Sequence, residues 1–293
     1  MDKTKIINEL IVWIEKNLDK PMTVDSVAAK AGYSKWHLQR MFKEITGQNI
    51  ISYIRARKLN ECALTLRLTK MPIIEVATLY HFDSQQAFNR AFKKQFHQAP
   101  AAYRMNQKWD MNGLFASMDY DVASLPEAHF VTMPEMKLVG FTSNYVCTYE
   151  EMAEAHARNK ARIWGKMFNT FRPDKLYCLT IASDIFFYSM GIYYAAAFDS
   201  KFLKRSAIKT TEMSIPAGDY VKFLYEGPAS GYQRFYQNIY HRCLPMLKAS
   251  RPATATSYDV ECLSRPDGAE IDLIKNPDTP IYCECFIPII HNP

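Results

Sequence analysis

The chain has 293 residues, of which 48% are hydrophobic and 23% charged, a composition that excludes a disordered or collagen-like chain. At roughly 150 residues per domain, this length suggests two domains. No stretch approaches the ~20 apolar residues of a membrane-spanning helix, and the first residues lack the apolar core of a signal peptide. Seven cysteines do not make a disulfide framework, so we expect reduced thiols in a cytoplasmic protein.

Charge is distributed unevenly along the chain. Residues 1–108 hold 18 Lys and Arg against 9 Asp and Glu, a balance of +9. Residues 109–293 hold 18 basic residues against 21 acidic ones, a balance of −3. This asymmetry indicates that the first part alone binds a polyanion, although charge by itself fits chance surface variation equally well.

Apolar residues at helical spacing predict a series of short helices through about residue 105. Residues 6–18 carry the first apolar stripe, and a longer helix is expected around residues 49–67. Capping side chains, helix-ending glycines and prolines suited to a first helical turn mark the other boundaries. In chain order these are Thr23, Gly32, Ser34, Gly47, Pro72, Ser84 and Pro100.

One part of this helical region is repeated. The helix that Ser34 caps has apolar residues at i, i+3 and i+4, and this spacing recurs after Ser84. The matched residues are Val27 and Val76, Ala28 and Ala77, Leu38 and Phe88, Arg40 and Arg90, Phe42 and Phe92, and Lys43 and Lys93. Two copies of short helix, tight turn and longer helix predict an all-α domain of two helix-turn-helix units.

The opposite faces of the two longer helices carry polar, basic and aromatic side chains. They are Trp36, Gln39, Arg40 and Lys43 on the first helix, and Gln86, Asn89, Arg90 and Lys93 on the second, where Lys94 follows Lys93. A helix fits the DNA major groove, where Arg can read guanine and Gln or Asn can read adenine. The lysines, with Arg55 or Arg57, would contact phosphates. The alternative is a bundle whose polar residues only face water, and an exposed Trp36 argues against it.

The residues around both helices resemble a known family. Residues 32–43 are similar to the first recognition segment of AraC/XylS-type transcription activators, in its most specific form the Mar/Sox/Rob subgroup. Residues 82–96, with Pro100 and Tyr103-Arg104 after them, are similar to the second. A DNA-binding domain followed by about 185 further residues resembles the two-domain members of this subgroup.

The resemblance implies a monomeric activator of stress, efflux and redox-defence genes, with double-stranded promoter DNA and RNA polymerase as partners and a place on the nucleoid. It implies that the two recognition helices occupy successive major-groove segments about one helical turn (~34 Å) apart. The residues it assigns to base contacts are Trp36, Gln39, Arg40, Gln85, Gln86 and Arg90. Ala87, Asn89 and His81 depart from the usual residues, so the second unit either reads bases or only contacts the backbone.

We expect a linker over residues 109–124 and a second domain over 125–293. The second domain reads as strand, helix and two strands, twice, which predicts an α+β domain of two β-α-β-β repeats. The segment from Ile215 to Pro228 and the closing Ile287-Pro288 resemble the gyrase-inhibitor-like effector-binding domain. The resemblance implies a cleft for an amphipathic small molecule that modulates the activator.

Two carboxylates in mostly apolar strands, Glu226 and Glu284, are candidate ligand contacts. Each needs a partner, which could be a ligand cation, a hydrogen-bond network or Lys222; an internal ion pair or a solvent-exposed edge position is an equal alternative. Aromatic residues could supply flat walls for the ligand. The candidates are Tyr145, Trp164, Tyr193, Tyr225 and Tyr282, each of which fits a core position as well.

The sequence predicts neither a metal site, a cofactor nor an enzyme. Cys283 and Cys285 share one face of a strand near Cys262, but they lack the spacing of a metal site. Phosphate-loop and nucleophile-elbow motifs are absent from the sequence. Two alternatives stay open: a hydrolase with Glu226 or Glu284 as general base, and a chromosome-binding protein of low sequence preference.

Overall fold

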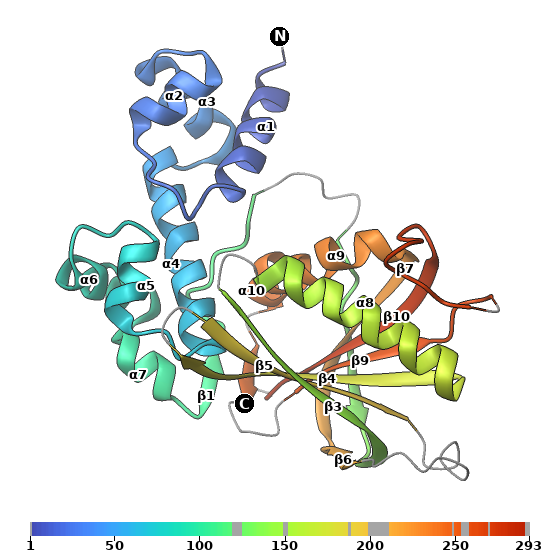
Figure 1. Cartoon of the computed structure of the whole chain (residues 1–293). Coiled ribbons are helices and arrows are strands. Elements are labelled where there is room, and N and C mark those ends of the chain that lie inside the picture. The colour runs from blue at the N-terminus through green and yellow to red at the C-terminus, as the bar shows by residue number, and fades with distance from the viewer. Residues whose placement is uncertain are drawn as a thin grey trace. The chain divides into compact units, whose positions relative to one another are not determined.

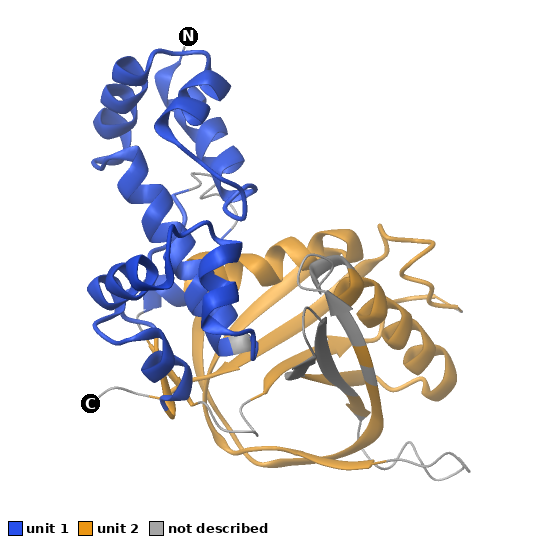
Figure 2. Ribbon diagram, turned by 60° about the vertical axis from the view of Figure 1, so that its left-hand side comes forward, with its two compact units in different colours: residues 1–106, 111–125, 244–248 blue, residues 107–110, 126–243, 249–293 orange. Residues whose placement is uncertain are grey.

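The computed structural model describes residues 2–118, 125–148, 152–186, 189–198, 211–247, 249–252, 258–268 and 270–290. The chain divides into two compact units (Figure 2), which comprise residues 1–106, 111–125 and 244–248, and residues 107–110, 126–243 and 249–293. The first unit is helical, and the second is built on a large antiparallel sheet. The predicted multidomain fold class is therefore confirmed. Among the residues described, no helix is long and apolar enough to span a membrane.

The helices before residue 106 follow the predicted order (Figure 1). They are α1 (Lys3–Glu15), α2 (Val24–Ala31), α3 (Lys35–Thr46), α4 (Ile50–Leu68), α5 (Ile73–Leu79), α6 (Gln85–Phe96) and α7 (Pro100–Met105). The two recognition helices begin in the same way, because Ser34 Oγ accepts the backbone N–H of His37 and Ser84 Oγ accepts that of Ala87, at 3.3 and 3.1 Å.

Histidine replaces glycine at two turns of the second repeat. Gly32 and Gly47 have φ values of 72° and 76°, in the left-handed region, and their counterparts His81 and His97 both have φ of 59°. This conformation costs a residue with a side chain about 1–2 kcal/mol. The His81 ring is hydrogen-bonded to the Asp19 carbonyl oxygen at 2.7 Å, which offsets part of that cost and ties this turn to the turn after α1.

Each repeat has its own apolar core, and α4 contributes to both. Ile50, Tyr53 and Ile54 from the first part of α4 pack with the buried faces of α1, α2 and α3. Further along α4, Thr65 Oγ1 is 3.2 Å from the Tyr80 hydroxyl at the end of α5. In the second repeat the Phe92 ring centre lies 4.5 to 5.5 Å from three other ring centres, which belong to Phe88, Phe96 and Tyr103.

A buried ion pair fastens α4 to α1. Arg57 has no exposed surface, and its Nε and Nη2 donate to the Glu15 carboxylate at 2.8 to 3.0 Å. Burial alone would lower the pKa of the Arg57 guanidinium, but the adjacent Glu15 carboxylate outweighs it and raises the pKa. Arg57 Nη1 also donates to the Phe115 carbonyl oxygen at 2.7 Å, so one guanidinium joins three segments.

The second unit contains one large sheet and a two-stranded ribbon. Its strands are β1 (Lys108–Asp110), β2 (His129–Met133), β3 (Met136–Thr148), β4 (Lys175–Phe186), β5 (Ser189–Phe198), β6 (Thr211–Ile215), β7 (Gly218–Pro228), β8 (Ser250–Pro252), β9 (Asp259–Ser264) and β10 (Pro280–Pro288). The large sheet has the order β2-β7-β10-β9-β4-β5-β3-β6, and β1 pairs with β8. The runs β3-α8-β4-β5 and β7-α9-β9-β10 form the two predicted β-α-β-β repeats, with α8 at Met152–Phe171 and α9 at Tyr232–Asn238.

Helices of the second unit pack on its sheet. Helix α8 contacts β3, β4 and β5, and α9 contacts β7. Helix α9 continues into a π-helical turn, Ile239–Cys243, and α10 follows at Leu244–Leu247. The Tyr232 hydroxyl of α9 lies 3.0 Å from Cys285 Sγ, so the odd-numbered residues of this part of β10 face α9 and its even-numbered residues face the other way.

The segment predicted as a linker has structure of its own. Trp109 of β1 is buried and lies 5.2 Å beneath the Arg251 guanidinium of β8. Arg251 in turn pairs with Asp259. Residues 111–118 belong to the helical unit, where the Phe115 carbonyl oxygen also accepts a hydrogen bond from Asn60 at 2.5 Å. One part of residues 109–124 packs in each unit. The use of this stretch as a linker between two domains stays a prediction.

The Arg57 ion pair yields a stability prediction. The Arg57→Met variant is expected to lose about 3–5 kcal/mol of unfolding free energy, because the partly buried Glu15 carboxylate loses its counterion and keeps only the hydrogen bond from the Tyr53 hydroxyl. The control is Arg55→Met, an exposed arginine on the same helix, which should shift the free energy by less than about 0.5 kcal/mol. Urea unfolding of the full chain, followed by circular dichroism, measures both. Equal stability of the two variants would contradict a structural role for the pair.

Candidate nucleic-acid interface and effector-binding site

The exposed face of α3 carries every residue that the sequence places there. Trp36, Gln39, Arg40 and Lys43 are all exposed, and Trp36 is the most prominent at 67%. The Arg40 guanidinium carbon lies 5.6 Å from the centre of the Trp36 ring, a cation–π contact that aligns the two side chains. The apolar stripe on the other side of α3 is buried in the repeat's core, so the helix presents this polar side to solvent.

Glu44 is a carboxylate on this otherwise basic face. Arg40 Nε donates to Glu44 Oε1 at 2.8 Å, and Lys3 Nζ lies 3.6 Å from Glu44 Oε2. The hydrogen bond from Arg40 lowers the pKa of Glu44, so the carboxylate is ionised at neutral pH. Glu44 therefore competes with any anion for the Arg40 guanidinium.

Helix α6 presents the matching face of the second repeat. All of its predicted contact residues are exposed: Gln85, Gln86, Asn89, Arg90, Lys93 and Lys94. Phe88, Phe92 and Phe96 are buried on the opposite side, which fixes the rotation of the helix. Ala87, one of the departures from the family pattern, is half-buried, so it offers little side chain to a partner.

The two arginines that were alternatives for phosphate contact differ in their exposure to solvent. Arg55 is exposed on α4, whereas Arg57 is buried and bonded to Glu15. The suggestion of Arg57 as a phosphate ligand is therefore wrong. The sequence could not distinguish them, because the partner that buries Arg57 comes from another helix.

The two candidate carboxylates of the second unit have different surroundings. Glu226 is exposed on β7. Glu284 on β10 accepts a hydrogen bond from Lys222 Nζ at 3.1 Å and lies 3.8 Å from Lys175 Nζ. It therefore has the internal ion pair that was one of the alternatives, and Lys222 reaches it from the adjacent strand β7. Because Glu284 is even-numbered on β10, this pair lies on the sheet face away from α9.

Two of the predicted aromatic residues meet around a third ring that the sequence analysis did not single out. Trp164 of α8 is buried, and its ring centre lies 5.4 Å from that of Tyr232 in an edge-on arrangement. The Tyr225 ring lies 5.3 Å from Tyr232 and 4.9 Å from Phe235. These contacts join α8, β7 and α9 in one aromatic cluster.

The other aromatic candidates lie elsewhere. The Tyr145 hydroxyl is hydrogen-bonded to His156 Nδ1, and burial lowers the pKa of His156, so this imidazole is neutral at pH 7. Tyr282 is 39% exposed on β10. Tyr193 is on β5, and its side chain falls outside the part of the chain that the structure describes.

A buried ion pair next to the aromatic cluster was missed by the sequence analysis. Lys160 of α8 and Glu261 of β9 are both almost fully buried, and Lys160 Nζ donates to Glu261 Oε1 at 2.7 Å. The Tyr232 hydroxyl donates to the same oxygen at 2.6 Å. Within the described residues, Glu261 Oε2 has no hydrogen-bond partner. A buried acceptor without a partner is costly, so this atom is suited to a ligand that brings a donor.

Two signals in the sequence could have found this pair. Lys160 lies four and eight positions before Trp164 and Phe168, which places a lysine on the apolar stripe of α8. Glu261 lies between apolar residues of a strand, as Glu226 and Glu284 do. What the sequence could not supply was the pairing of a helix residue with a strand residue a hundred positions later.

The cysteines of β10 do not form a metal site with other described residues. Cys283 Sγ and Cys285 Sγ lie 4.0 Å apart on the face toward α9. Burial raises the pKa of the Cys283 thiol, which opposes the thiolate that a metal requires. Among the side chains described, no group of three or more His, Cys, Asp or Glu could hold a metal ion.

Comparisons with known proteins identify both regions. A helix-turn-helix domain family matches residues 27–106, and the family of the GyrI-like small molecule binding domain matches residues 126–290. The chain is 39% identical to the right origin-binding protein of Escherichia coli strain K12 and 38% identical to the transcriptional regulator Rob of Salmonella typhimurium, in each case over 99% of both chains. The regulatory protein SoxS of Escherichia coli strain K12 is 47% identical over 104 residues, which are 36% of this chain and 97% of SoxS.

These matches define a class of two-part regulators that join an AraC-type DNA-binding region to a small-molecule-binding region. The chain belongs to the family of AraC-type transcription regulators that carry a GyrI-like domain. The predicted resemblance is confirmed, and with it the general function, a DNA-binding transcription activator with a small-molecule-binding domain. Of these similar proteins, one is named for binding to an origin and two are named as regulators.

The position of Glu44 leads to a prediction about DNA affinity. The Glu44→Gln variant is expected to bind duplex DNA several-fold more tightly at low salt, because it frees Arg40 and removes a negative charge from the basic face. The gain should shrink as salt is added. Fluorescence anisotropy with a labelled promoter duplex measures it, with the exposed Glu9→Gln on α1 as the matched control. An equal gain in the control would mean that only net charge matters.

The Lys160–Glu261 pair leads to a second prediction. The Lys160→Met variant is expected to lose about 3–5 kcal/mol of unfolding free energy, because the buried Glu261 carboxylate loses its counterion. Adding Glu261→Gln should restore most of this loss, since the charge that needed Lys160 is then gone. Lys166→Met, an exposed lysine on the same helix, is the control. Denaturant unfolding of the unaltered chain, both single variants, the double variant and the control measures the coupling. Additive losses from Lys160→Met and Glu261→Gln would contradict it.

Proposed function

We propose that this activator reads degenerate promoter sites of stress, efflux and redox-defence genes as a monomer. In this proposal residues 1–108 bind the DNA, and α3 and α6 enter successive major-groove segments. The observation that carries the proposal is the pair of equivalent helices, each begun by a serine cap and each with an exposed polar and basic face. Two such helices in one chain replace the two-fold dimer with which many helix-turn-helix proteins read a site.

In the first unit, Trp36, Gln39 and Arg40 would contact base edges, and Lys43 a phosphate. Arg40 can bond two guanine acceptors at once, Gln39 can bond adenine, and the Trp36 ring offers an apolar surface to a thymine methyl group. The stacking of Arg40 against Trp36 supports this assignment, because it orients the guanidinium before DNA is bound.

In the second unit, Gln85, Gln86 and Arg90 would face the bases, with Asn89 beside them. Lys93 and Lys94 would lie against phosphates. The half-buried Ala87 supports a smaller contribution to base reading from this unit, because a short apolar side chain replaces a polar one. We infer that the first unit supplies most of the sequence discrimination and the second a larger share of backbone contacts.

RNA polymerase is the proposed protein partner, and the nucleoid the proposed location. The second unit would modulate activity through a small amphipathic effector, which shifts populations only if it prefers one form of the protein. We infer that Glu261, supported by Lys160 and Tyr232, is the polar contact for that effector. The free Glu261 Oε2 supports this role, whereas Glu284 already has two lysines. Because Lys160 neutralises Glu261, a neutral N–H or O–H donor suits the site.

Arg40 and Lys43 provide the test of DNA reading. The Arg40→Ala variant should lose about 1–3 kcal/mol of binding free energy on the correct promoter site and much less on random DNA, so that discrimination is relaxed. The Lys43→Ala variant, three positions further along the same face, should lose affinity equally on both DNAs and lower the salt slope by about 1. Competition titrations at several salt concentrations measure both effects.

The same titrations separate the alternatives. Equal losses for Arg40→Ala on specific and random DNA would mean that Arg40 contacts only the backbone. A specificity ratio near one for the unaltered chain, at physiological salt, would replace the promoter-reading activator with a chromosome-binding protein of low preference.

A further inference from the structure

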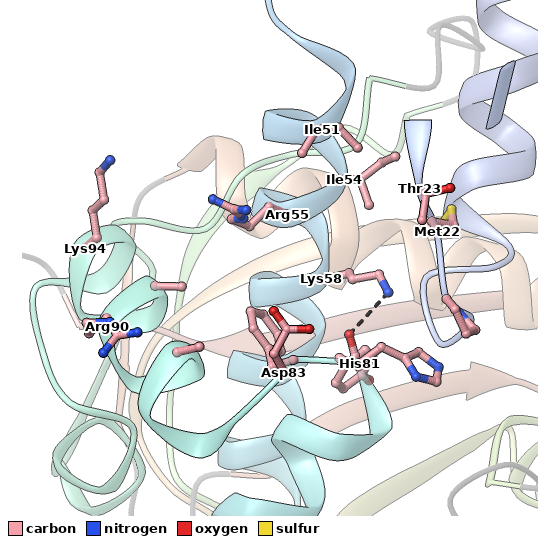
Figure 3. Close-up of a pocket in the computed structure, with 15 residues that line it drawn as sticks. Met22, Thr23, Ile51, Ile54, Arg55, Lys58, His81, Asp83, Arg90 and Lys94 are labelled. Carbon is pink, nitrogen blue, oxygen red and sulfur yellow. Dashed lines mark hydrogen bonds between the residues drawn. The ribbon is translucent and has the colours of Figure 1, made fainter. Parts of the chain in front are cut away.

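A hollow of about 660 Å³ lies within the helical unit, between α4, α6 and the residues around Met22 (Figure 3). Sites that bind small molecules have volumes in the range of roughly 300–1,000 Å³. The hollow is separate from the second unit, since all the residues that line it lie between Pro21 and Lys94. It arises where the two repeats meet on either side of α4.

Apolar side chains form part of the wall. Ile51 and Ile54 project from α4, Met22 comes from the segment before α2, and Phe82 from the turn before α6. Ile54 is buried, and the other three are half-buried. An exposed concave surface of this kind gains free energy when an apolar group covers it.

Cationic side chains form the other part. Arg55 on α4 and Arg90 and Lys94 on α6 line the hollow, and Asp83 is the carboxylate among the lining residues. Within the described part of the chain, none of these three cations takes part in an ion pair. Three basic side chains around one concave surface raise its affinity for an anion.

A buried ammonium group lies at the inner side of the hollow. Lys58 is only 7% exposed, and its Nζ donates to the carbonyl oxygens of Lys20 and Tyr80 at 2.8 and 3.2 Å; Figure 3 marks the second bond. The third N–H has no acceptor among the described residues. Burial lowers the pKa of Lys58, which means that its charge is incompletely compensated and that a nearby anion would stabilise it.

We propose that this hollow binds a small amphipathic anion, an aromatic or aliphatic carboxylate whose head contacts Lys58 and the surrounding cations and whose body covers Ile51, Ile54 and Met22. A DNA phosphate fits less well, because the wall is partly apolar and Lys58 lies too deep for a backbone held on the outer surface of a duplex. The proposal adds a ligand site to the DNA-binding unit itself.

The anion site would be coupled to DNA binding through shared residues. Arg90 and Lys94 line the hollow and also belong to the face of α6 that is proposed to meet DNA. A bound anion would draw them inward and neutralise them, so that anion and DNA weaken each other's binding by the same factor. This coupling rests on the proposed function, whereas the existence of the site does not.

Photolabelling of the full chain tests the site without DNA. The probe is 4-benzoylbenzoate, a carboxylate with an aromatic body that reacts with nearby C–H groups on irradiation, and peptide mass spectrometry locates the label. We expect labelling at Met22, Ile51 or Ile54. The matched cationic probe, 4-(aminomethyl)benzophenone, should leave these residues unlabelled. Equal labelling by both probes, or carboxylate labelling only outside the hollow, would overturn the proposal.

Three variants sharpen the result. Ile51→Trp fills the hollow and should abolish labelling, whereas Ile74→Trp, the same change at an exposed position of α5, should leave it intact. Lys58→Met should lower labelling by about tenfold or more, because it removes a charge-assisted hydrogen bond. Circular dichroism confirms that each variant is folded. If Ile51→Trp is folded and labelled as strongly as the unaltered chain, the assignment is wrong.

A promoter duplex then tests the coupling. Excess duplex should suppress labelling in the hollow, and 4-benzoylbenzoate should weaken DNA binding of the unaltered chain but not of Ile51→Trp. Labelling that duplex leaves unchanged would overturn the coupling and support the site alone. A chain that is labelled as expected but shows no preference for promoter DNA would instead contradict the proposed function, so the two failures are distinguishable.

Discussion

The arrangement of the DNA-binding unit depends on how α4 is held between the two repeats. Arg57 ties this helix to α1 through Glu15, and Lys58 ties it to the turns after α1 and α5 through two carbonyl oxygens. Hydrogen bonds from charged donors are directional and strong when they are buried. They fix the rotation of α4 relative to both repeats, which apolar packing alone would leave less defined. These bonds therefore constrain the helix that connects the repeat of α3 to the repeat of α6.

This constraint explains why α4 lacks the simple amphipathic pattern of its neighbours. A surface helix buries one stripe, but α4 packs against the first repeat with Ile50, Tyr53 and Ile54 and against the second with residues further along. Buried polar residues on such a helix need partners from both sides. Burying these charges costs desolvation free energy. In return, the two helix-turn-helix repeats keep a fixed geometry around α4.

The limits of sequence reasoning follow from the same physics. Caps such as Ser34 and Ser84, and the buried stripe that turns Trp36 and Arg40 outward, are local and could be predicted from spacing within a few residues. Arg57 could not be told from Arg55, and Lys58 gave no signal, because their partners lie up to 58 positions away. The Lys160–Glu261 pair is the same case in the second unit, since its partners are 101 positions apart. Local periodicity reports which face is apolar, whereas the pairing of buried charges depends on the tertiary fold.

The surroundings of the two buried lysines, Lys160 and Lys58, lack different hydrogen-bonding groups. This difference determines which ligand suits each unit. In the second unit, Lys160 donates to the Glu261 carboxylate. The other oxygen of that carboxylate, Oε2, has no donor among the described residues. In the helical unit, the partners of Lys58 among the residues described are two carbonyl oxygens, which leaves one N–H of its ammonium group to donate to an anion. A ligand whose polar group donates a hydrogen bond suits Glu261 but not Lys58. Two buried donors that face each other cannot form a hydrogen bond, and leaving both unsatisfied costs free energy. The proposed effector site and the proposed anion site therefore call for ligands of opposite hydrogen-bonding character.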